Sequence, residues 1–223
     1  MTAEVEKMLT KIKEPGSAIT HFIGMVLAAL AAIPMLLRAS AASSPKVVVS
    51  LFVFAVSIIG LYTASTAYHT FDISPRANTF LQKIDHIMIS VLIAGTYTPV
   101  CTAVIGGQSG KITLIVIWSL AALQTLLNII YIRCPKWLSS AIYIGMGWIC
   151  VHAFGTILSS IGTAGFILLL SGGIVYTAGG VVYALKLPAF DSRHPAFGTH
   201  EIFHLFVLAG SVLHFLLMFI YVK

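Results

Sequence analysis

The sequence predicts an all-α membrane protein, a bundle of seven transmembrane helices. Of its 223 residues, 58% are hydrophobic and only 9% are charged, whereas a soluble domain carries about 25% charged residues. Seven apolar stretches are each long enough to cross a bilayer, which takes about 20 residues in a helix. Because backbone groups in lipid must be paired within their own segment, we expect these stretches to be helices.

Short polar or proline-containing segments separate the apolar stretches. We expect helices near residues 18–37, 47–69, 83–105, 111–131, 138–158, 163–185 and 199–222. The connections are too short to hold another domain, so we expect one transmembrane domain over residues 18–223. Residues 1–17 are polar and contain several lysines, which predicts a cytoplasmic segment and not a cleavable signal peptide.

The basic residues predict the orientation of the bundle. If the N-terminus is cytoplasmic, nine Lys and Arg lie on that side and four on the other, which agrees with the excess of basic residues in cytoplasmic loops. The nine are Lys7, Lys11, Lys13, Arg76, Lys83, Arg133, Lys136, Lys186 and Arg193, and the four are Arg38, Lys46, Lys111 and Lys223. The C-terminus is then outside. Although the net charge is +6, the basic residues stand singly between apolar runs, so we expect no nucleic-acid partner.

Some residues within the stretches predict local features. Thr98-Pro99 should kink the third helix. The sixth stretch contains five glycines, which favour close packing against neighbouring helices or, alternatively, a hinge; they are Gly165, Gly172, Gly173, Gly179 and Gly180. The three cysteines, Cys101, Cys134 and Cys150, are isolated, so they predict neither a disulfide framework nor a thiolate metal site.

Two histidines, His200 and His204, open the last apolar stretch four residues apart. On a helix they lie on one face, about 6 Å apart along the axis, and can share a metal ion. The predicted orientation places His69, Ser65 and Asp85 at the same cytoplasmic depth. Three imidazoles with a nearby carboxylate match a zinc site that keeps one coordination position open. We therefore predict that His69, His200 and His204 bind zinc.

Asp85 and Ser65 are the candidate catalytic residues. Zinc polarises a carbonyl group and lowers the pKa of water, so Asp85 could accept a proton from that water and Ser65 could hydrogen-bond the water or the substrate. Other interpretations stay open: His69 could end its helix at the headgroups, Asp85 could be a charge at a helix N-terminus, and Ser65 could bond to its own helix backbone.

The remaining histidines are weaker candidates. His21 opens the first helix and could support the site, whereas His86 points about 100° away from Asp85 on a helix, which favours packing. His152 and His214 lie deeper in the membrane, where we expect them to form hydrogen bonds between helices.

The segment from His200 to His204 also matches HExxH, the metalloprotease signature in which the glutamate is the general base. An intramembrane protease would need a third ligand, typically an aspartate in a glycine-containing motif, and no such motif stands out. Glu201 is equally well explained as an acidic residue at a helix N-terminus. We therefore do not favour a protease.

The chain resembles the bacterial hemolysin III proteins, a branch of the progestin and adipoQ receptor superfamily that includes the adiponectin receptors. The motifs that carry the resemblance are Glu14-Pro-Gly-Ser-Ala-Ile-Thr-His21, Ser65-Thr-Ala-Tyr-His69, Lys83-Ile-Asp85-His86, Gly95-Thr-Tyr-Thr-Pro99, His200-x-x-x-His204 and Gly210-Ser-Val-Leu-His214-Phe. The resemblance implies a seven-helix bundle in a bacterial plasma membrane, with zinc near the cytoplasmic face. It also implies that His69, His200 and His204 are the zinc ligands.

The resemblance further implies what the site does. The aspartate that matches Asp85 holds a water molecule at the metal, and the serine that matches Ser65 lies beside it. The wider group includes alkaline ceramidases, which suggests hydrolysis of an amide or ester bond in a membrane lipid. A membrane-damaging cytolysin and a lipid sensor with structural zinc are the alternatives. The long polar N-terminal region of the receptors is missing, so we do not expect a protein hormone to bind. Ser17 stands where relatives often carry Asn.

Overall fold

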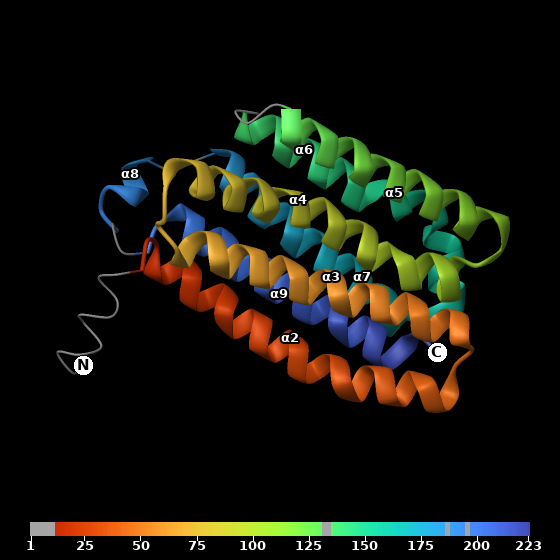
Figure 1. The fold of residues 1–223 in the computed structure, drawn as a ribbon. Helices are drawn as coiled ribbons and strands as arrows, with labels where there is room; N and C mark the ends of the chain where they lie inside the picture. The colour runs from red at the N-terminus through yellow and green to blue at the C-terminus, as the bar shows by residue number, and fades with distance from the viewer. Residues whose placement is uncertain (1–11, 131–134, 186–187, 195–196) are drawn as a thin grey trace.

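The computed structural model describes residues 12–130, 135–185, 188–194 and 197–223, and within these ranges every regular element is a helix. The long helices lie side by side along a common direction and form one bundle (Figure 1). The prediction of an all-α fold is therefore confirmed.

The first three helices each begin at a proline. They are α2 (Pro15–Ala42), α3 (Pro45–Thr70) and α4 (Pro75–Pro99). Proline is well suited to the first position of a helix, where its missing N–H would have no partner anyway. At the start of α4 the Ser74 hydroxyl also accepts a hydrogen bond from the Ala77 N–H at 3.2 Å. α4 begins well before the predicted residue 83, because its first turns are polar and the prediction followed only the apolar residues.

The helix changes its form directly after Pro99. The next six residues are a π-helix, η1 (Val100–Ile105), which is followed by α5 (Gly107–Ile130). Gly106 and Gly107 both have positive φ, of 65° and 55°, and they form the turn between the two helices. The irregularity predicted at Thr98-Pro99 thus takes the form of a wider helical turn, since Pro99 has no N–H for the regular helical hydrogen bond.

The helix of the next apolar stretch is interrupted slightly later in the chain than the sequence predicts. α6 (Lys136–Gly147) continues through a 3₁₀ helix, η2 (Trp148–Ala153), into α7 (Phe154–Leu185). Inside α7, Gly162 has non-helical backbone angles, with φ 67° and ψ 178°. Beyond this break the chain folds back, so that a Cβ on Gly180 would lie 3.2 Å from Ile144 of α6. We expected the break at Ser159-Ser160; glycine tolerates the required backbone angles and serine does not.

Six described helical stretches are long and apolar enough to cross a membrane. One of them, Trp137–Leu185, has 49 residues, which would extend about 74 Å as a straight helix, more than twice the hydrocarbon thickness of about 30 Å. It contains two of the seven predicted crossings, 138–158 and 163–185. The short α8 (Pro188–Asp191) then leads to α9 (Thr199–Tyr221).

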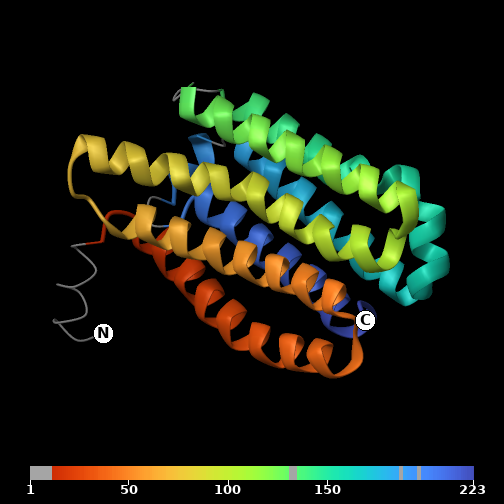
Figure 2. The ribbon, with the colours of Figure 1, turned by 45° about the vertical axis from the view of Figure 1, so that its right-hand side comes forward.

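The order of packing places α9 within the bundle. α9 packs against both α2 and α7, while α3 packs against α2 and α4, as Figures 1 and 2 show. Buried side chains such as Phe54, Leu217 and Met218 fill the interior. The outer side of α2 is apolar and exposed, with Leu27, Leu30, Ile33 and Leu37 all more than half exposed. A surface of this kind requires lipid around it, which identifies the chain as a multi-pass membrane protein.

The glycines of α7 allow close packing, as the sequence predicts. A Cβ on Gly172 would lie 2.7 Å from the Nε2 atom of His214, and one on Gly179 would lie 2.7 Å from the Cβ of Phe206. Both contacts are with α9. The absence of a side chain at these positions therefore lets α7 and α9 approach each other closely.

Candidate metal centre and cavity

Three histidines from two helices meet at the end of the bundle where α3 ends and α9 begins. One ligand atom each of His69, His200 and His204 lies within 4.8 Å of the others, and the Nε2 atoms of His69 and His200 are 3.4 Å apart. Zinc–nitrogen bonds of about 2.05 Å place neighbouring ligands of a tetrahedral ion roughly 3.3 Å apart. The donor atoms and their spacing therefore fit one metal ion. The structure brings together the three residues that the sequence predicts as ligands.

Helix geometry and burial both prepare these histidines for a metal. His69 lies in the last turn of α3, and His200 and His204 lie in the first two turns of α9. The ring centroids of His200 and His204 are 4.5 Å apart, and each is 5.0 Å from that of His69. His69 is only 1% exposed and His204 only 2%. Little water can therefore reach the ring nitrogens of His69 and His204, whereas His200 is only partly buried.

Glu14, directly before α2, contacts the first of the three histidines. Its Oε2 atom is 2.5 Å from Nδ1 of His69, and its backbone N–H donates to the His69 carbonyl at 2.9 Å. A hydrogen bond at Nδ1 leaves Nε2 free to bind a metal and fixes the orientation of the ring. This hydrogen bond also lowers the pKa of the Glu14 carboxyl below its ordinary value. The sequence offered Glu14 only as part of a motif, since the two residues are far apart along the chain.

Glu201, the glutamate of the HExxH match, holds the beginning of α9. Its Oε2 accepts a hydrogen bond from the Gly198 N–H at 2.9 Å, and its Oε1 accepts one from the Ser17 hydroxyl at 2.7 Å. One carboxylate oxygen thus caps the first turn of α9, and the other connects α9 to α2. These contacts favour the interpretation of Glu201 as a helix-terminal acid over that of a protease base.

His21 packs against the cluster. Its ring stacks on that of His204, with centroids 3.7 Å apart and an interplanar angle of 9°. Neither ring nitrogen of His21 has a hydrogen-bond partner within the described part of the chain. Next to it, the Thr20 hydroxyl lies 3.4 Å from Nδ1 of His204. The first turns of α2 therefore support the three histidines from one side.

Ser65 and Asp85 line a cavity together with His200 and His204. Ser50 and Ser57 of α3 bond to carbonyls of their own helix. Ser65 makes no such bond to its own helix, and its hydroxyl lies close to the Asp85 carboxyl. The alternative of a back-bonded serine is thus wrong. The Asp85 carboxyl lies close enough to His69 to interact with it electrostatically.

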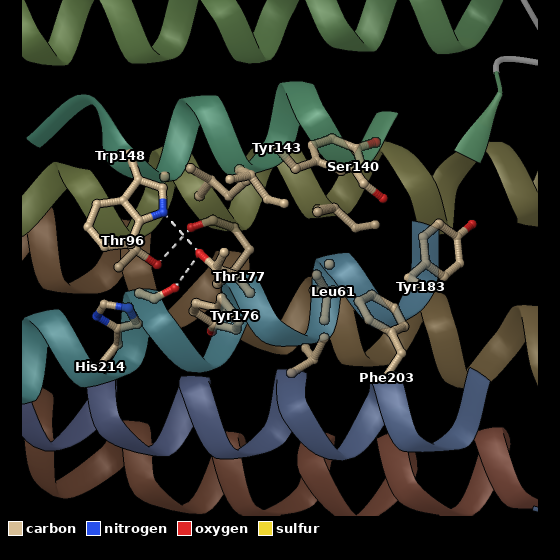
Figure 3. A pocket seen from close by; sticks show the side chains of 18 of the residues that line it. Leu61, Thr96, Ser140, Tyr143, Trp148, Tyr176, Thr177, Tyr183, Phe203 and His214 are labelled. Carbon is tan, nitrogen blue, oxygen red and sulfur yellow. Dashed lines mark hydrogen bonds between the residues drawn. The ribbon is translucent and has the colours of Figure 1, made fainter. Parts of the chain in front are cut away.

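The cavity has a volume of about 170 Å³ and extends along the helices between α3, α4, α6, α7 and α9. Figure 3 shows part of its wall, from Tyr183 and Phe203 to Trp148 and His214. Most of the lining side chains are apolar. The polar group of Trp148 is satisfied inside the protein, because its Nε1–H donates to the Thr177 hydroxyl at 2.9 Å.

The other histidines discussed in the sequence analysis agree with their predicted contacts to different extents. His152 lies 3.0 Å from the Thr113 hydroxyl of α5, which confirms the expected contact between helices. His214 was expected to do the same, but its buried Nδ1 has no hydrogen-bond partner among the described residues. His86 lines the cavity, and its carbonyl accepts a hydrogen bond from the Tyr143 hydroxyl at 2.9 Å.

Among the cysteines that the structure describes, both are free and buried, namely Cys101 and Cys150. This agrees with the expectation of isolated apolar cysteines. Cys134 lies outside the described residues.

Comparison with known proteins shows that the chain matches one family model and is similar to two bacterial proteins. A family model described as haemolysin-III related matches residues 9–215. A protein named Hemolysin-3 from Bacillus cereus is 34% identical over 223 residues, which cover 100% of this chain and 98% of the relative. A Hemolysin-3 homolog from Bacillus subtilis (strain 168) is 36% identical over 214 residues, or 96% of each chain. Both similarities include the histidine cluster and the cavity.

Proposed function

The chain belongs to the haemolysin III family, and from this premise we propose that it is a zinc-dependent hydrolase that cleaves an amide or ester bond of a membrane lipid. One observation carries the proposal. The three-histidine cluster, Ser65 and Asp85 lie at one end of a cavity whose wall is otherwise mostly apolar. Metal ligands, a proton acceptor and room for a lipid chain are thus combined inside the bundle.

In this proposal His69, His200 and His204 hold the zinc ion. Zinc bound by three histidines keeps one coordination position open, and it supplies a Lewis acid that polarises a carbonyl group and makes water more acidic. Glu14 keeps the ring of His69 in its binding orientation. Thr20 and His21 support His204 from the side of α2.

The side chains that line the cavity carry out the proton transfers. Asp85 accepts a proton from the attacking water while the water oxygen forms a bond to the carbonyl carbon. The bond from that carbon to nitrogen or oxygen then breaks, and Asp85 returns the proton to the leaving group. The Ser65 hydroxyl, which has no bond to its own helix, hydrogen-bonds the carbonyl or the water. The apolar wall holds the lipid chain.

The proposal includes a topology of seven crossings with the N-terminus in the cytoplasm and the C-terminus outside. Two features support it: the fold-back at Gly162 within the 49-residue stretch, and the excess of basic residues on the side of the N-terminus. α2 and α9 both begin at the end of the bundle that holds the histidine cluster (Figure 1). In this topology the cluster lies near the cytoplasmic face.

Replacement of Asp85 by alanine tests the proposal. Purified protein is incubated with membrane lipids, and the release of fatty acid is measured by mass spectrometry with and without a zinc chelator. We expect zinc-dependent release by the wild-type protein, whereas D85A should retain zinc and lose turnover because the proton acceptor is gone. Asp72→Ala is a matched control, since Asp72 follows the end of α3, is exposed and accepts a hydrogen bond from Asn78 of α4, away from the histidine cluster. Full turnover by D85A would refute the mechanism.

The names of the two relatives, Hemolysin-3 and Hemolysin-3 homolog, favour cytolysis as a second candidate. A pore requires a polar path along several helices, whereas the cavity wall is mostly apolar. Discrete conductance in a planar bilayer, retained after all three histidines are replaced, would favour the cytolysin. Bound zinc without any release of fatty acid would instead favour a lipid sensor with structural zinc.

A further inference from the structure

The cavity has a second polar end, at His214, away from the histidine cluster. His204 and His214 both line the cavity, and they lie ten residues apart on α9, about 15 Å along the helix axis. Figure 3 shows His214 beside Tyr176 at one end of the view and Tyr183 at the opposite end. The two polar ends are therefore separated by about half of a bilayer core.

The wall between these two ends is mostly apolar. Its apolar side chains come from α3, α4 and α9 and include Leu61, Ile89, Leu92 and Val207. The order along the cavity is thus polar, apolar, polar. A ligand with the same order of groups would match it.

His214 is buried without being hydrogen-bonded. It is 6% exposed, and its Nδ1 has no partner within the described residues. A buried polar atom without a partner lowers stability, and an ionisable side chain within a membrane segment indicates function. The ring is nevertheless held in place, since it stacks on Tyr176 at 5.3 Å and its Nε2 packs against Gly172.

The polar groups around His214 already have partners inside the protein. The hydroxyls of Tyr62 and Tyr176 both bond to the Ser211 hydroxyl, at 2.7 and 2.8 Å. The Trp148 Nε1–H donates to Thr177. His214 therefore differs from its neighbours in keeping hydrogen-bonding capacity at the cavity wall.

We propose that His214 binds an oxygen atom carried on a lipid chain, so that the cavity recognises oxygenated lipids in preference to plain ones. A hydroxyl group can donate to or accept from an imidazole nitrogen, whereas a saturated hydrocarbon can do neither. The polar end of the lipid lies at the histidine cluster. The oxygen on the lipid chain then lies about 15 Å from that end, which is the separation of His204 and His214 along α9. This site does not depend on the metal or on hydrolysis.

The test compares two fatty acids that differ by one terminal hydroxyl, 12-hydroxydodecanoic acid and dodecanoic acid, because the length of a twelve-carbon chain matches this separation. Their affinities are measured by displacement of a fluorescent fatty acid from the purified protein in lipid nanodiscs. The wild-type protein should bind the hydroxylated acid about fivefold more tightly, as expected for one hydrogen bond. His214→Phe retains an aromatic ring but no nitrogen, so it should bind both acids equally and dodecanoic acid as tightly as the wild type does.

Controls separate this site from the proposed hydrolase. His152→Phe removes an imidazole that bonds to Thr113, and it should keep the preference for the hydroxylated acid. Protein treated with a chelator should also keep it, even if hydrolysis is lost or was never present. Without ligand, His214→Phe should be at least as stable to heat as the wild type, because no hydrogen bond is lost. Equal binding of both acids by the wild type, a preference retained by His214→Phe, or a large loss of its stability would each overturn the proposal.

Discussion

At the scale of single residues, the candidate centre depends on side chains that do not themselves bind the metal. Glu14 contacts His69 through both its carboxylate and its backbone N–H, and Ser17 contacts Glu201 at the start of α9. Both residues belong to the first turn of α2 or lie directly before it. This short segment thus links the two helices that supply the histidines.

Glu14→Gln should weaken zinc binding by about tenfold to a hundredfold, the usual effect of losing a partner behind a metal-bound histidine. Glutamine is similar in size but lacks the carboxylate charge that faces Nδ1 of His69. Zinc affinity is measured by competition with a chromogenic chelator.

Asp72→Asn is the matched control for Glu14→Gln, since it also removes a carboxylate charge near the end of α3 but leaves the cluster intact. Its zinc affinity should equal that of the wild type. An unchanged affinity in Glu14→Gln would show that Glu14 does not position the ligand.

At the scale of elements, glycines determine where a helix is interrupted and where two helices pack closely against each other. Gly162 separates the two halves of the longest apolar stretch through a φ of 67° and a ψ of 178°, a region that only glycine occupies readily. Gly172 and Gly179 bring α7 against α9. Gly162 is needed for its backbone angles, whereas Gly172 and Gly179 are needed because a side chain there would not fit between α7 and α9.

Gly162→Ala should destabilise the protein by about 1–3 kcal/mol, because alanine is strained in this backbone conformation although there is room for its Cβ. Gly155→Ala is the control, since Gly155 is exposed within regular helix and its Cβ would also meet no atom. Unfolding in mixed detergent micelles measures both variants. Equal stability of the two would mean that the chain does not turn at Gly162.

At the scale of the whole molecule, the bundle has two distinct ends. The end that holds the histidine cluster is also where α2 begins, and α9 finishes at the other end (Figure 2). The seven-crossing topology that we propose has an odd number of crossings and therefore predicts that the two termini lie on opposite sides of the membrane.

Fusions at the two termini should report opposite sides of the membrane. A fluorescent protein that matures only in the cytoplasm should be active at the N-terminus, and an alkaline phosphatase that is active only outside should work at the C-terminus. Exchanging the two reporters should abolish both signals. Two active cytoplasmic fusions would contradict the seven-crossing topology.

Much of the fold could be predicted because hydrophobicity reports membrane crossings directly. The histidine cluster could also be predicted, since the basic residues place His69, His200 and His204 at one depth. The sequence could not show the contact of Glu14 with His69, because it joins segments that are far apart along the chain. Nor could it show that Ser65 lacks a bond to its own helix, which depends on the side-chain rotamer, or that the break falls at Gly162 within a continuous apolar run.

The origin of the histidines on α3 and α9 has a consequence for how the protein is made. Two of the three belong to the final helix, which starts only at Thr199, so a ribosome must synthesise nearly the entire chain before all the ligands exist. Truncated or stalled products can insert most of their helices but cannot form the cluster. If the proposed zinc site is real, it is loaded only after nearly the whole chain is made, and loading distinguishes finished molecules from incomplete ones.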